Sequence, residues 1–508
     1  MHDDHRRSPE HPRLPDTRNA RMPGGDPGGA GPIGGGKVKE IELMILGSGP
    51  AGLAAAIEAV RAGASVTLLD ENEKPGGQIY RQLAAGYQVT DPGTLGRDYL
   101  RGQKLLAEFD SIRLKIDYLD QALVWGIFPD RELAFLRGEE SQSVRYRKLI
   151  IAAGAYDRPV PFPGWTLPGV FTAGGAQRMV KIQRVLPGES ILLAGTGPLQ
   201  LALANQIAKA GGHVAAIVEA GRIDSWPRLL GATWGQWQLL SDAMHYLMGV
   251  RLARIPLWRK HIIVEARGDG KVEEAVVAEV DRSWRPKPGT ERTLSVDTIC
   301  IGYGFVPSTE LTRMARCEHR YEPLLGGWIP VLSEDMQTSV SDIYSAGDCT
   351  GIAGSMVALE EGRIAGIDAA RSLGYLSPEE AAKRAEPSRK RLAGLKRLRR
   401  VLDEISMPRP GLYELAKDDT IVCRCEELTL AEIREALQNG ATDMNEIKRM
   451  TRMGMGNCQG RMCAPALQEI IAREKRVPAS DIVYLNPRPP VKPIPLAVLA
   501  EHKELLDT

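Results

Sequence analysis

The feature that most constrains this chain is a glycine-rich turn at the start of its apolar sequence. A run of strand-like apolar residues leads into Gly47-Ser-Gly49-Pro-Ala-Gly52, a helical pattern follows, and a second apolar run ends on Asp70. Gly47 permits a tight turn, Gly49 lets the backbone approach a pyrophosphate, and Gly52 lets the helix pack closely on the strand. This order predicts a βαβ nucleotide-binding unit whose ribose hydroxyls are bound by Asp70 or by its neighbour Glu71.

Later segments point to a flavin. The Gly76-Gly77 pair would let backbone lie against a flat ring system. The segment 338–351 contains strand-like residues that are followed by Gly347-Asp348. With the buried strand and prolines of 149–164, these motifs resemble the two-dinucleotide-domain flavoprotein, disulfide-reductase-like superfamily. There, the pair that matches Gly347-Asp348 contacts the ribityl and pyrophosphate region of the flavin. The resemblance implies FAD, although another adenine nucleotide would satisfy the same glycines.

Residues 190–220 repeat the strand, turn, helix and strand plan. In the resembled superfamily this inserted domain binds NAD(P)H. Gly195, Gly197 and Glu219 are present, but Gln200 stands at the third glycine position. Its side chain should push the helix from the strand or turn aside into nucleotide space. We therefore expect the fold to be kept, and the sequence does not favour NAD(P) as a ligand.

Four of the seven cysteines lie in one C-terminal segment, as Cys423, Cys425, Cys458 and Cys463. Helix-capping signals between them predict short helices that fold the two pairs together. Four converging thiolates hold zinc or an iron–sulfur cluster. The one-residue gap of the first pair is unusual for zinc, so the spacing favours a [2Fe–2S] cluster and leaves zinc open. Residues 420–477 also resemble the bacterioferritin-associated-ferredoxin-like [2Fe–2S] domain, which commonly has fewer residues between its last two cysteines.

Charge and hydropathy exclude several classes of protein. Lys and Arg number 65 against 64 for Asp and Glu, a formal net charge of +1, so nothing favours nucleic acid as a partner. No apolar run has the length of a transmembrane helix, and the N-terminus lacks the apolar core of a secretory signal. We therefore expect a cytoplasmic location. A basic stretch over 379–404 carries leucines at near-helical spacing, which favours a helix that packs on its own protein over one that binds an acidic partner or nucleic acid.

The expected fold is α/β, a two-dinucleotide-binding-domain flavoprotein with a small helical [2Fe–2S] domain at its C-terminus. We expect these parts: a disordered tail (1–38), a discontinuous FAD-type domain (39–165 and 290–374), an inserted second dinucleotide-type domain (166–289), a basic helical connector (375–418), the [2Fe–2S] domain (419–480) and a C-terminal tail (481–508).

This combination resembles the family of opine oxidase A (alpha) subunits, and it is similar also to the B subunit of hydrogen cyanide synthase and to the alpha subunits of proline and hydroxyproline dehydrogenases. The resemblance implies a heteromeric oxidoreductase acting on CH–NH donors. A smaller amino-acid-oxidase-like flavoprotein, the B subunit, would cleave octopine or nopaline oxidatively to arginine and a 2-oxo acid. This chain would relay the electrons to an acceptor, and FMN at the subunit interface is a further candidate cofactor. The chain shows no side-chain constellation that identifies catalytic residues.

Other interpretations stay open from the sequence. Glycine oxidation to cyanide and proline or hydroxyproline oxidation are alternatives within the same class of enzyme. From other classes, the chain could be a self-sufficient NAD(P)H-dependent reductase, or a non-catalytic scaffold with zinc at its cysteines. The substrate, the final acceptor and the stoichiometry with the partner do not follow from one sequence.

Overall fold

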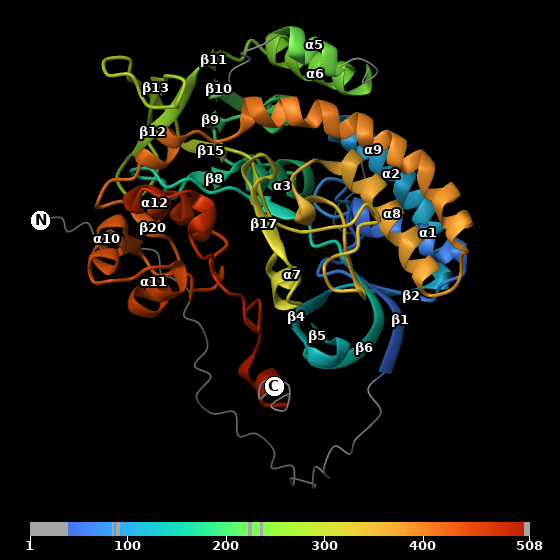
Figure 1. The fold of residues 1–508 in the computed structure, drawn as a ribbon. Helices are drawn as coiled ribbons and strands as arrows, with labels where there is room; N and C mark the ends of the chain where they lie inside the picture. The colour runs from blue at the N-terminus through green and yellow to red at the C-terminus, as the bar shows by residue number, and fades with distance from the viewer. Residues whose placement is uncertain (1–38, 84–85, 88–91, 222–225, 234–236, 502–508) are drawn as a thin grey trace, which may run out of the picture. The chain divides into compact units, whose positions relative to one another are not determined.

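A mixed sheet carries the first glycine-rich turn. The computed structural model describes residues 39–83, 86–87, 92–221, 226–233 and 237–501, so the tail expected over 1–38 lies outside the described residues. From edge to edge the sheet runs β3 (Ile116–Leu119), β2 (Val66–Leu69), β1 (Lys39–Leu46), β6 (Glu140–Ile151), β5 (Glu132–Arg137) and β4 (Ala122–Phe128), with β19 (Ile343–Ser345) also paired to β6 (Figure 1). β1 pairs in parallel with β2 and β6, as a βαβ unit requires, whereas β4, β5 and β6 form an antiparallel meander.

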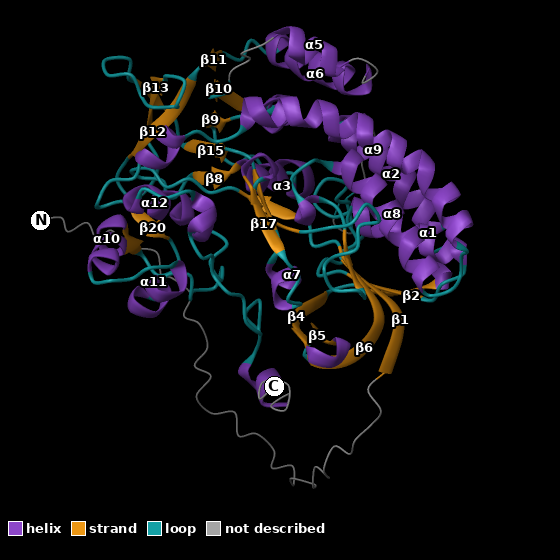
Figure 2. Ribbon diagram, viewed as in Figure 1, coloured by secondary structure: helices purple, strands orange, loops and turns teal. Residues whose placement is uncertain are grey.

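Helices cover the sheets and build the C-terminal part of the chain (Figure 2). Capping signals in the sequence mark several of their starts: the hydroxyl groups of Ser377 and Thr429 each accept a hydrogen bond from the backbone N–H three residues later. The α-helices of the described residues are α1 (Pro50–Ala62), α2 (Arg97–Asp110), α3 (Ala173–Arg178), α4 (Pro198–Lys209), α5 (Trp226–Thr233), α6 (Trp237–Leu252), α7 (Glu310–Met314), α8 (Ser355–Ser372), α9 (Pro378–Ser406), α10 (Leu430–Gln438), α11 (Met444–Thr451), α12 (Ala464–Lys475) and α13 (Leu496–Glu501).

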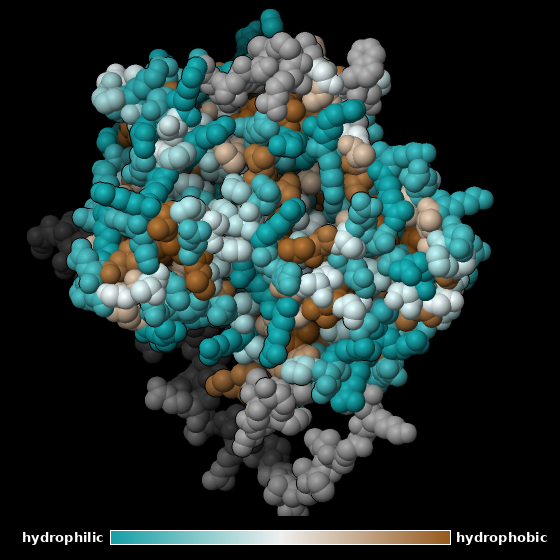
Figure 3. Space-filling view, in the orientation of Figure 1, coloured by the Kyte–Doolittle hydropathy of each residue, from teal (hydrophilic) through white to brown (hydrophobic). Residues whose placement is uncertain are grey.

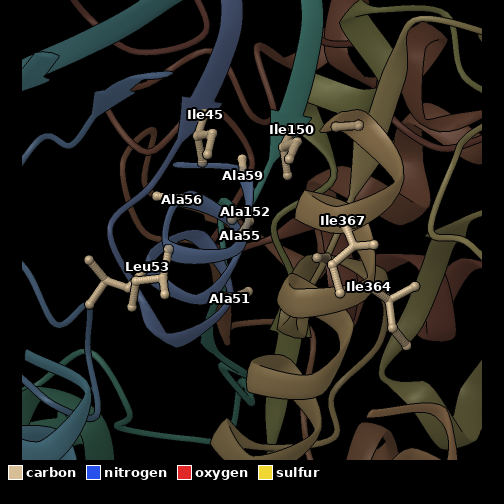
Figure 4. Packing of buried hydrophobic residues seen from close by; sticks show 14 of the residues in the cluster. Ile45, Ala51, Leu53, Ala55, Ala56, Ala59, Ile150, Ala152, Ile364 and Ile367 are labelled. Carbon is tan, nitrogen blue, oxygen red and sulfur yellow. The ribbon is translucent and has the colours of Figure 1, made fainter. Parts of the chain in front are cut away.

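Helix α1 packs between the first sheet and α8, and small residues make this packing close. A Cβ at Gly362 of α8 would lie 2.1 Å from the carbonyl oxygen of Ala51, and one at Gly366 would lie 2.3 Å from that of Ala55. Figure 4 shows the alanines of α1 between the isoleucines of the strands and those of α8. The helix that follows the glycine turn is therefore held on two sides.

A second sheet is entirely parallel. Its order is β11 (Leu257–Arg259), β10 (His213–Glu219), β9 (Ser190–Gly195), β15 (Thr298–Gly302) and β8 (Val170–Thr172). Because β15 is a fully buried strand that pairs with both β9 and β8, the chain leaves this sheet only after Gly302, and not at residue 290 as expected from the sequence. The chain passes between the two sheets twice, and the two connecting segments form the antiparallel strands β7 (Ala155–Asp157) and β16 (Phe305–Pro307), which pair with each other.

Three small β-structures complete the fold. An antiparallel sheet packs beside the second sheet, and two hairpins lie further along the chain. Their strands are β12 (His261–Arg267), β13 (Glu274–Glu279), β14 (Arg292–Ser295), β17 (His319–Glu322), β18 (Gly327–Pro330), β20 (Ile421–Cys423) and β21 (Leu428–Thr429).

The basic stretch forms the long helix α9, which packs on the protein itself. Leu392, Leu395 and Leu398 are buried, and the first two belong to the core that contains α1 and α8. The expectation of a helix that packs on its own chain is confirmed. Two of its cations face carboxylates of α8: Arg391 pairs with Glu360, and Lys396 pairs with the residue after it.

The C-terminal helices α10, α11 and α12 enclose a hydrophobic core of their own, separate from the cores of the two sheets. This domain hydrogen bonds to the part of the chain that contains the two large sheets, since the indole nitrogen of Trp165 donates to the carbonyl oxygen of Ile421 at 2.6 Å. The face of the molecule in Figure 3 is mostly hydrophilic, with scattered hydrophobic patches. Among the residues that the structure describes, no helix is long and apolar enough to cross a membrane.

Candidate cofactor sites

Backbone contacts in the first glycine turn leave no room for a side chain at two of its three glycines. Gly47 has a φ of +100°, and a Cβ there would lie 2.4 Å from the carbonyl oxygen of Ala152. A Cβ at Gly52 would lie 1.8 Å from the carbonyl oxygen of Gly47. Helix α1 begins after Gly49, which offers no side-chain cap, so its first N–H groups suit an anionic ligand such as a pyrophosphate.

Asp70 is buried beside this turn and holds it in place. Its Oδ2 accepts hydrogen bonds from the backbone N–H and the hydroxyl of Ser48, at 2.6 and 2.7 Å. Its Oδ1 accepts from the backbone N–H and the side-chain amide of Asn72, both at 2.8 Å. The ribose contact expected of Asp70 stays a prediction, and a bound ribose would compete with Ser48 or Asn72. The neighbouring alternative, Glu71, forms an ion pair with Lys492.

The Gly76-Gly77 loop lies directly against the first turn. The N–H of Gly76 donates to the carbonyl oxygen of Ser48 at 2.8 Å, and a Cβ at Gly77 would lie 2.7 Å from the Cα of Gly49. The φ angles of the pair, +122° and +61°, are positive. The structure therefore brings together two motifs that are separated by a helix and a strand in the sequence.

The Gly347-Asp348 turn is distant in the sequence but reaches the same place, because it follows β19, which pairs with β6 beside β1. Gly347 has a φ of +83°, and a Cβ there would lie 2.9 Å from the Cβ of Ala51 at the start of α1. The carboxylate of Asp348 accepts hydrogen bonds from the N–H groups of Ala353 and Gly354. All the predicted glycines of the first site thus lie around the N-terminus of α1.

A buried carboxylate supports this turn, and the sequence analysis missed it. Glu361 of α8 accepts hydrogen bonds from the N–H of Gly347 and the hydroxyl of Thr350, both at 3.1 Å. Burial raises the pKa of Glu361, while Lys396 of α9, 3.3 Å away, acts against that rise. The only signal in the sequence was an acidic residue on the apolar face of a helix, which has no distinctive spacing.

The second glycine turn accommodates Gln200 without losing its fold. The side chain is fully buried, and its Nε2 donates to the carbonyl oxygens of Ala194 and Gly302 at 3.3 and 3.4 Å. The space comes from glycines, because a Cβ at Gly195 or at Gly302 would lie within 2.4 Å of that nitrogen. The side chain of Gln200 is therefore directed beneath the turn, toward the strands.

Glu219, the acidic residue at the end of β10, and the C-terminal end of α9 both lie close to this turn. Glu219 accepts hydrogen bonds from the N–H groups of Gly197 and Gly221, at 3.2 and 2.7 Å, and burial raises its pKa. A Cβ at Gly197 would lie 3.5 Å from the hydroxyl of Ser406, and one at Gly221 would lie 3.3 Å from the carbonyl oxygen of Ile405. The C-terminal end of α9 therefore adjoins the place where a pyrophosphate would approach.

The structure brings the four predicted cysteines together in two contacting pairs. The thiol of Cys423 hydrogen bonds with that of Cys463, and the thiol of Cys425 hydrogen bonds with that of Cys458. Each pair takes one cysteine from each segment of the sequence. Among the described residues, no three His, Cys, Asp or Glu side chains are arranged around a single metal ion. Two pairs of thiols suit a centre with two irons.

The surroundings of the thiols also suit an iron–sulfur cluster. Backbone N–H groups are directed at the sulfurs, which stabilises thiolates and tunes the potential of a cluster. The hydrogen bond with Cys463 contributes most to lowering the pKa of Cys423 to about 6, whereas the same contact raises the pKa of Cys463. The donors are Gly454, Cys425 and Glu426 toward Cys423, and Gly460 and Met462 toward Cys458.

Family comparisons agree with this arrangement. A model described as pyridine nucleotide-disulphide oxidoreductase matches residues 41–374, and one described as BFD-like [2Fe-2S] binding domain matches residues 421–473, which include all four cysteines. The chain belongs to the pyridine nucleotide-disulphide oxidoreductase family. It is an α/β flavoprotein and an oxidoreductase whose cofactors are FAD and a [2Fe–2S] cluster.

Individual relatives narrow the family further. The chain is 37% identical to hydrogen cyanide synthase subunit HcnB of Pseudomonas aeruginosa, over 90% of this chain and 98% of the relative. It is 36% identical to the A subunit of opine oxidase from Rhizobium meliloti, over 91% of this chain and 87% of the relative. The chain therefore belongs to the family that contains these two subunits. The crystal structure of L-proline dehydrogenase from P. horikoshii has the same fold, with a TM-score of 0.65, 20% identity, and coverage of 91% of this chain and 79% of that one.

Proposed function

We propose that this chain is the A (alpha) subunit of a heteromeric, flavin-dependent opine oxidase in the cytoplasm. A smaller amino-acid-oxidase-like flavoprotein, the B subunit, removes two electrons and two protons from the secondary amine of octopine or nopaline. The imine that results takes up water and separates into arginine and a 2-oxo acid. This chain receives the electrons and passes them toward an acceptor.

The observation that carries the proposal is the union of two redox sites in one folded unit. The turn around the N-terminus of α1 and the four thiols belong to domains that are hydrogen-bonded to each other. Similarity to the A subunit of opine oxidase extends over both domains.

The residues of each site have specific roles in this proposal. The first site binds FAD, or another adenine nucleotide, through the backbone of Gly47, Gly49 and Gly52, with the Gly76-Gly77 and Gly347-Asp348 segments facing the cofactor. FAD, when bound there, supplies the capacity to take up electrons in pairs. The chain's own groups hold it: the N–H groups of α1 bind phosphate, and Asp70 keeps the turn in shape.

The proposed ligands of the [2Fe–2S] cluster are the four cysteines, Cys423, Cys425, Cys458 and Cys463. A cluster there supplies one-electron transfer. The end of α9 adjoins the second glycine turn, where a pyrophosphate would approach, and this is the reason to propose that NAD(P)H does not deliver electrons to the chain. The same proposal includes FMN as a further cofactor at the interface with the partner subunit.

The test is low-temperature EPR on the chain co-purified with its presumed partner, without air. Octopine, nopaline, glycine and proline are added separately, and dithionite serves as the control. A [2Fe–2S] signal raised by an opine supports the proposal. The absence of a signal even with dithionite contradicts the cluster, and zinc analysis then decides whether the thiols hold a single ion.

Hydrogen cyanide synthase is the second candidate, and the identity to HcnB favours it as strongly as the identity to opine oxidase favours the first. A signal with glycine, and none with opines, selects it. A signal with proline alone selects a proline dehydrogenase. Bleaching of the flavin by NADH in the isolated chain would instead support a self-sufficient reductase.

A further inference from the structure

The four thiols lie at two different depths. Cys423 and Cys463 belong to the hydrophobic core of the C-terminal domain, with 1% and 0% of their surface exposed. Cys425 is exposed and Cys458 is partly exposed. The buried thiols contact each other, as do the outer ones, so depth and contact divide the four into the same two pairs. A cluster bound by all four has an inner iron and an outer iron.

The inner pair faces the flavoprotein part across two tyrosines. Tyr484, which follows α12, hydrogen bonds with Tyr156 of β7. Tyr484 also lies within electrostatic range of Cys463. The guanidinium of Arg313 lies over the Tyr484 ring, 5.0 Å from its centre, which is a favourable cation–π contact. The two aromatic rings therefore span the boundary between the domains.

The same tyrosines lead back to the flavin turn. Tyr156 follows the strand β6, whose end carries the carbonyl oxygen of Ile151, 3.4 Å from the Sγ of Cys349. Cys349 is the residue next to Asp348 of the predicted flavin contact. Bonded and closely packed atoms thus connect Asp348 with Tyr156, and through Tyr484 with the inner thiols.

The outer pair opens toward water. A Cβ at Gly456 would lie 2.4 Å from the Cβ of Cys425, so only a glycine can pass this close to the outer ligand. Arg424, beside Cys425, is exposed. An added negative charge is less costly close to water than in an apolar core. The difference in burial between the two pairs therefore favours the outer iron as the place where the electron resides.

We propose that Cys423 and Cys463 hold the iron that faces the flavoprotein part, and that Cys425 and Cys458 hold the iron that faces solvent. Electrons would reach a bound cluster from the side of Tyr484, and the iron held by Cys425 and Cys458 would be the one that is reduced to the ferrous state. That iron would return to the ferric state when the single electron passes to a one-electron acceptor that docks beside the exposed Cys425. The proposal rests on the electron-transfer role proposed above.

The first test is Mössbauer spectroscopy of the full chain, reconstituted with ⁵⁷Fe and reduced by dithionite. Four variants are compared, C423S, C425S, C458S and C463S, because a serine ligand shifts the spectrum of the iron that it binds. We expect C425S and C458S to change the ferrous doublet, and C423S and C463S to change the ferric one. Variants that sort as Cys423 with Cys425 overturn the pairing. A ferrous doublet changed by C423S and C463S overturns the direction.

A second measurement needs no change at the ligands. A soluble dysprosium chelate is added to the reduced wild-type chain, and the microwave power saturation of its EPR signal is recorded. A solvent-facing ferrous iron relaxes faster with the chelate present. An unchanged saturation curve contradicts the outer location, and this result stands even if a serine variant loses its cluster.

The entry side is tested by photoreducing the bound flavin and following the cluster by its visible absorbance. Y484L should slow the transfer several-fold. Y321L is the matched control, because Tyr321 also crosses the domain boundary, to Glu469, but on another path. Equal rates in both variants overturn the entry side. Dithionite and light replace the amine substrate throughout, so the inference can fail while the proposed opine chemistry holds, and the reverse.

Discussion

The glycine at position 52 gives the sharpest test of the first site. Replacing Gly52 by alanine places a Cβ 1.8 Å from the carbonyl oxygen of Gly47, whereas an ordinary carbon–oxygen contact is about 3.5 Å. The start of α1 must therefore retreat by more than an ångström. It has little freedom to do so, because Gly362 of α8 allows the opposite side of α1 to lie in close backbone contact.

The magnitude follows from two opposing effects. Alanine in place of glycine favours a helix by about 1 kcal/mol. Overpacking costs about 1–3 kcal/mol, and a backbone oxygen has less room to move than a side chain. We expect Gly52→Ala to lower the free energy of unfolding by about 1–2 kcal/mol and to lower the FAD content, since the displaced turn no longer directs its N–H groups at the pyrophosphate.

The matched control is Gly231→Ala in α5, where an added Cβ meets nothing within 4 Å. It should leave both quantities unchanged or raise the stability slightly. Urea unfolding gives the free energy, and the absorbance of released flavin gives the FAD content. If Gly52→Ala kept full FAD and matched the control in stability, the close packing of helix and turn would not be the basis of binding.

Three further predictions concern pH and the contacts between domains. Desolvation lowers the pKa of His319 to about 4, so the unfolded chain takes up a proton before the folded chain does as the pH falls from about 6.5 to 4. Over that pH range the free energy of unfolding of the wild type should fall by about 2–3 kcal/mol more than that of His319→Gln, as measured by urea unfolding. Lys396→Met should leave the carboxylate of Glu361 without its ion pair and cost about 1–2 kcal/mol at neutral pH, a loss that shrinks in acid as Glu361 takes up a proton, and a constant loss would contradict it. Trp165→Phe should remove the hydrogen bond to Ile421 and cost about 1 kcal/mol, seen as faster hydrogen exchange in the C-terminal domain, with unchanged exchange as the contrary result.

Local patterns in the sequence predicted local structure well. The turn before α1 and the capping box at Thr429 each depend on neighbouring residues, so their spacing is sufficient to identify them. The leucines of α9 predicted a buried stripe for the same reason. The family resemblance supplied the flavin, the spacing of the cysteines and the resemblance together favoured the cluster, and the family comparisons confirmed both.

Contacts between distant parts of the chain could not be predicted. Nothing near Gln200 in the sequence shows that Gly302, on another strand, leaves space for its amide. The sequence also contained no sign that Ser48 and Asn72 donate hydrogen bonds to the carboxylate oxygens of Asp70, the residue predicted to bind ribose. The grouping of the thiols by depth depends on how three helices pack, and one-dimensional spacing does not contain that information.

The chain does not end at its cysteine domain but returns to the first sheet. Val491 donates its N–H to the carbonyl oxygen of Trp125 at 2.8 Å, and Ile494 and Leu499 pack on the hydrophobic group around that tryptophan. The C-terminal domain, which holds the four cysteines, is therefore anchored at both of its ends, by α9 before it and by residues 491–499 after it. Such a domain does not swing like a carrier on a flexible arm. The electron transfer proposed between the flavin site and the four cysteines would then cover a fixed distance, and its rate should not depend on the viscosity of the solvent.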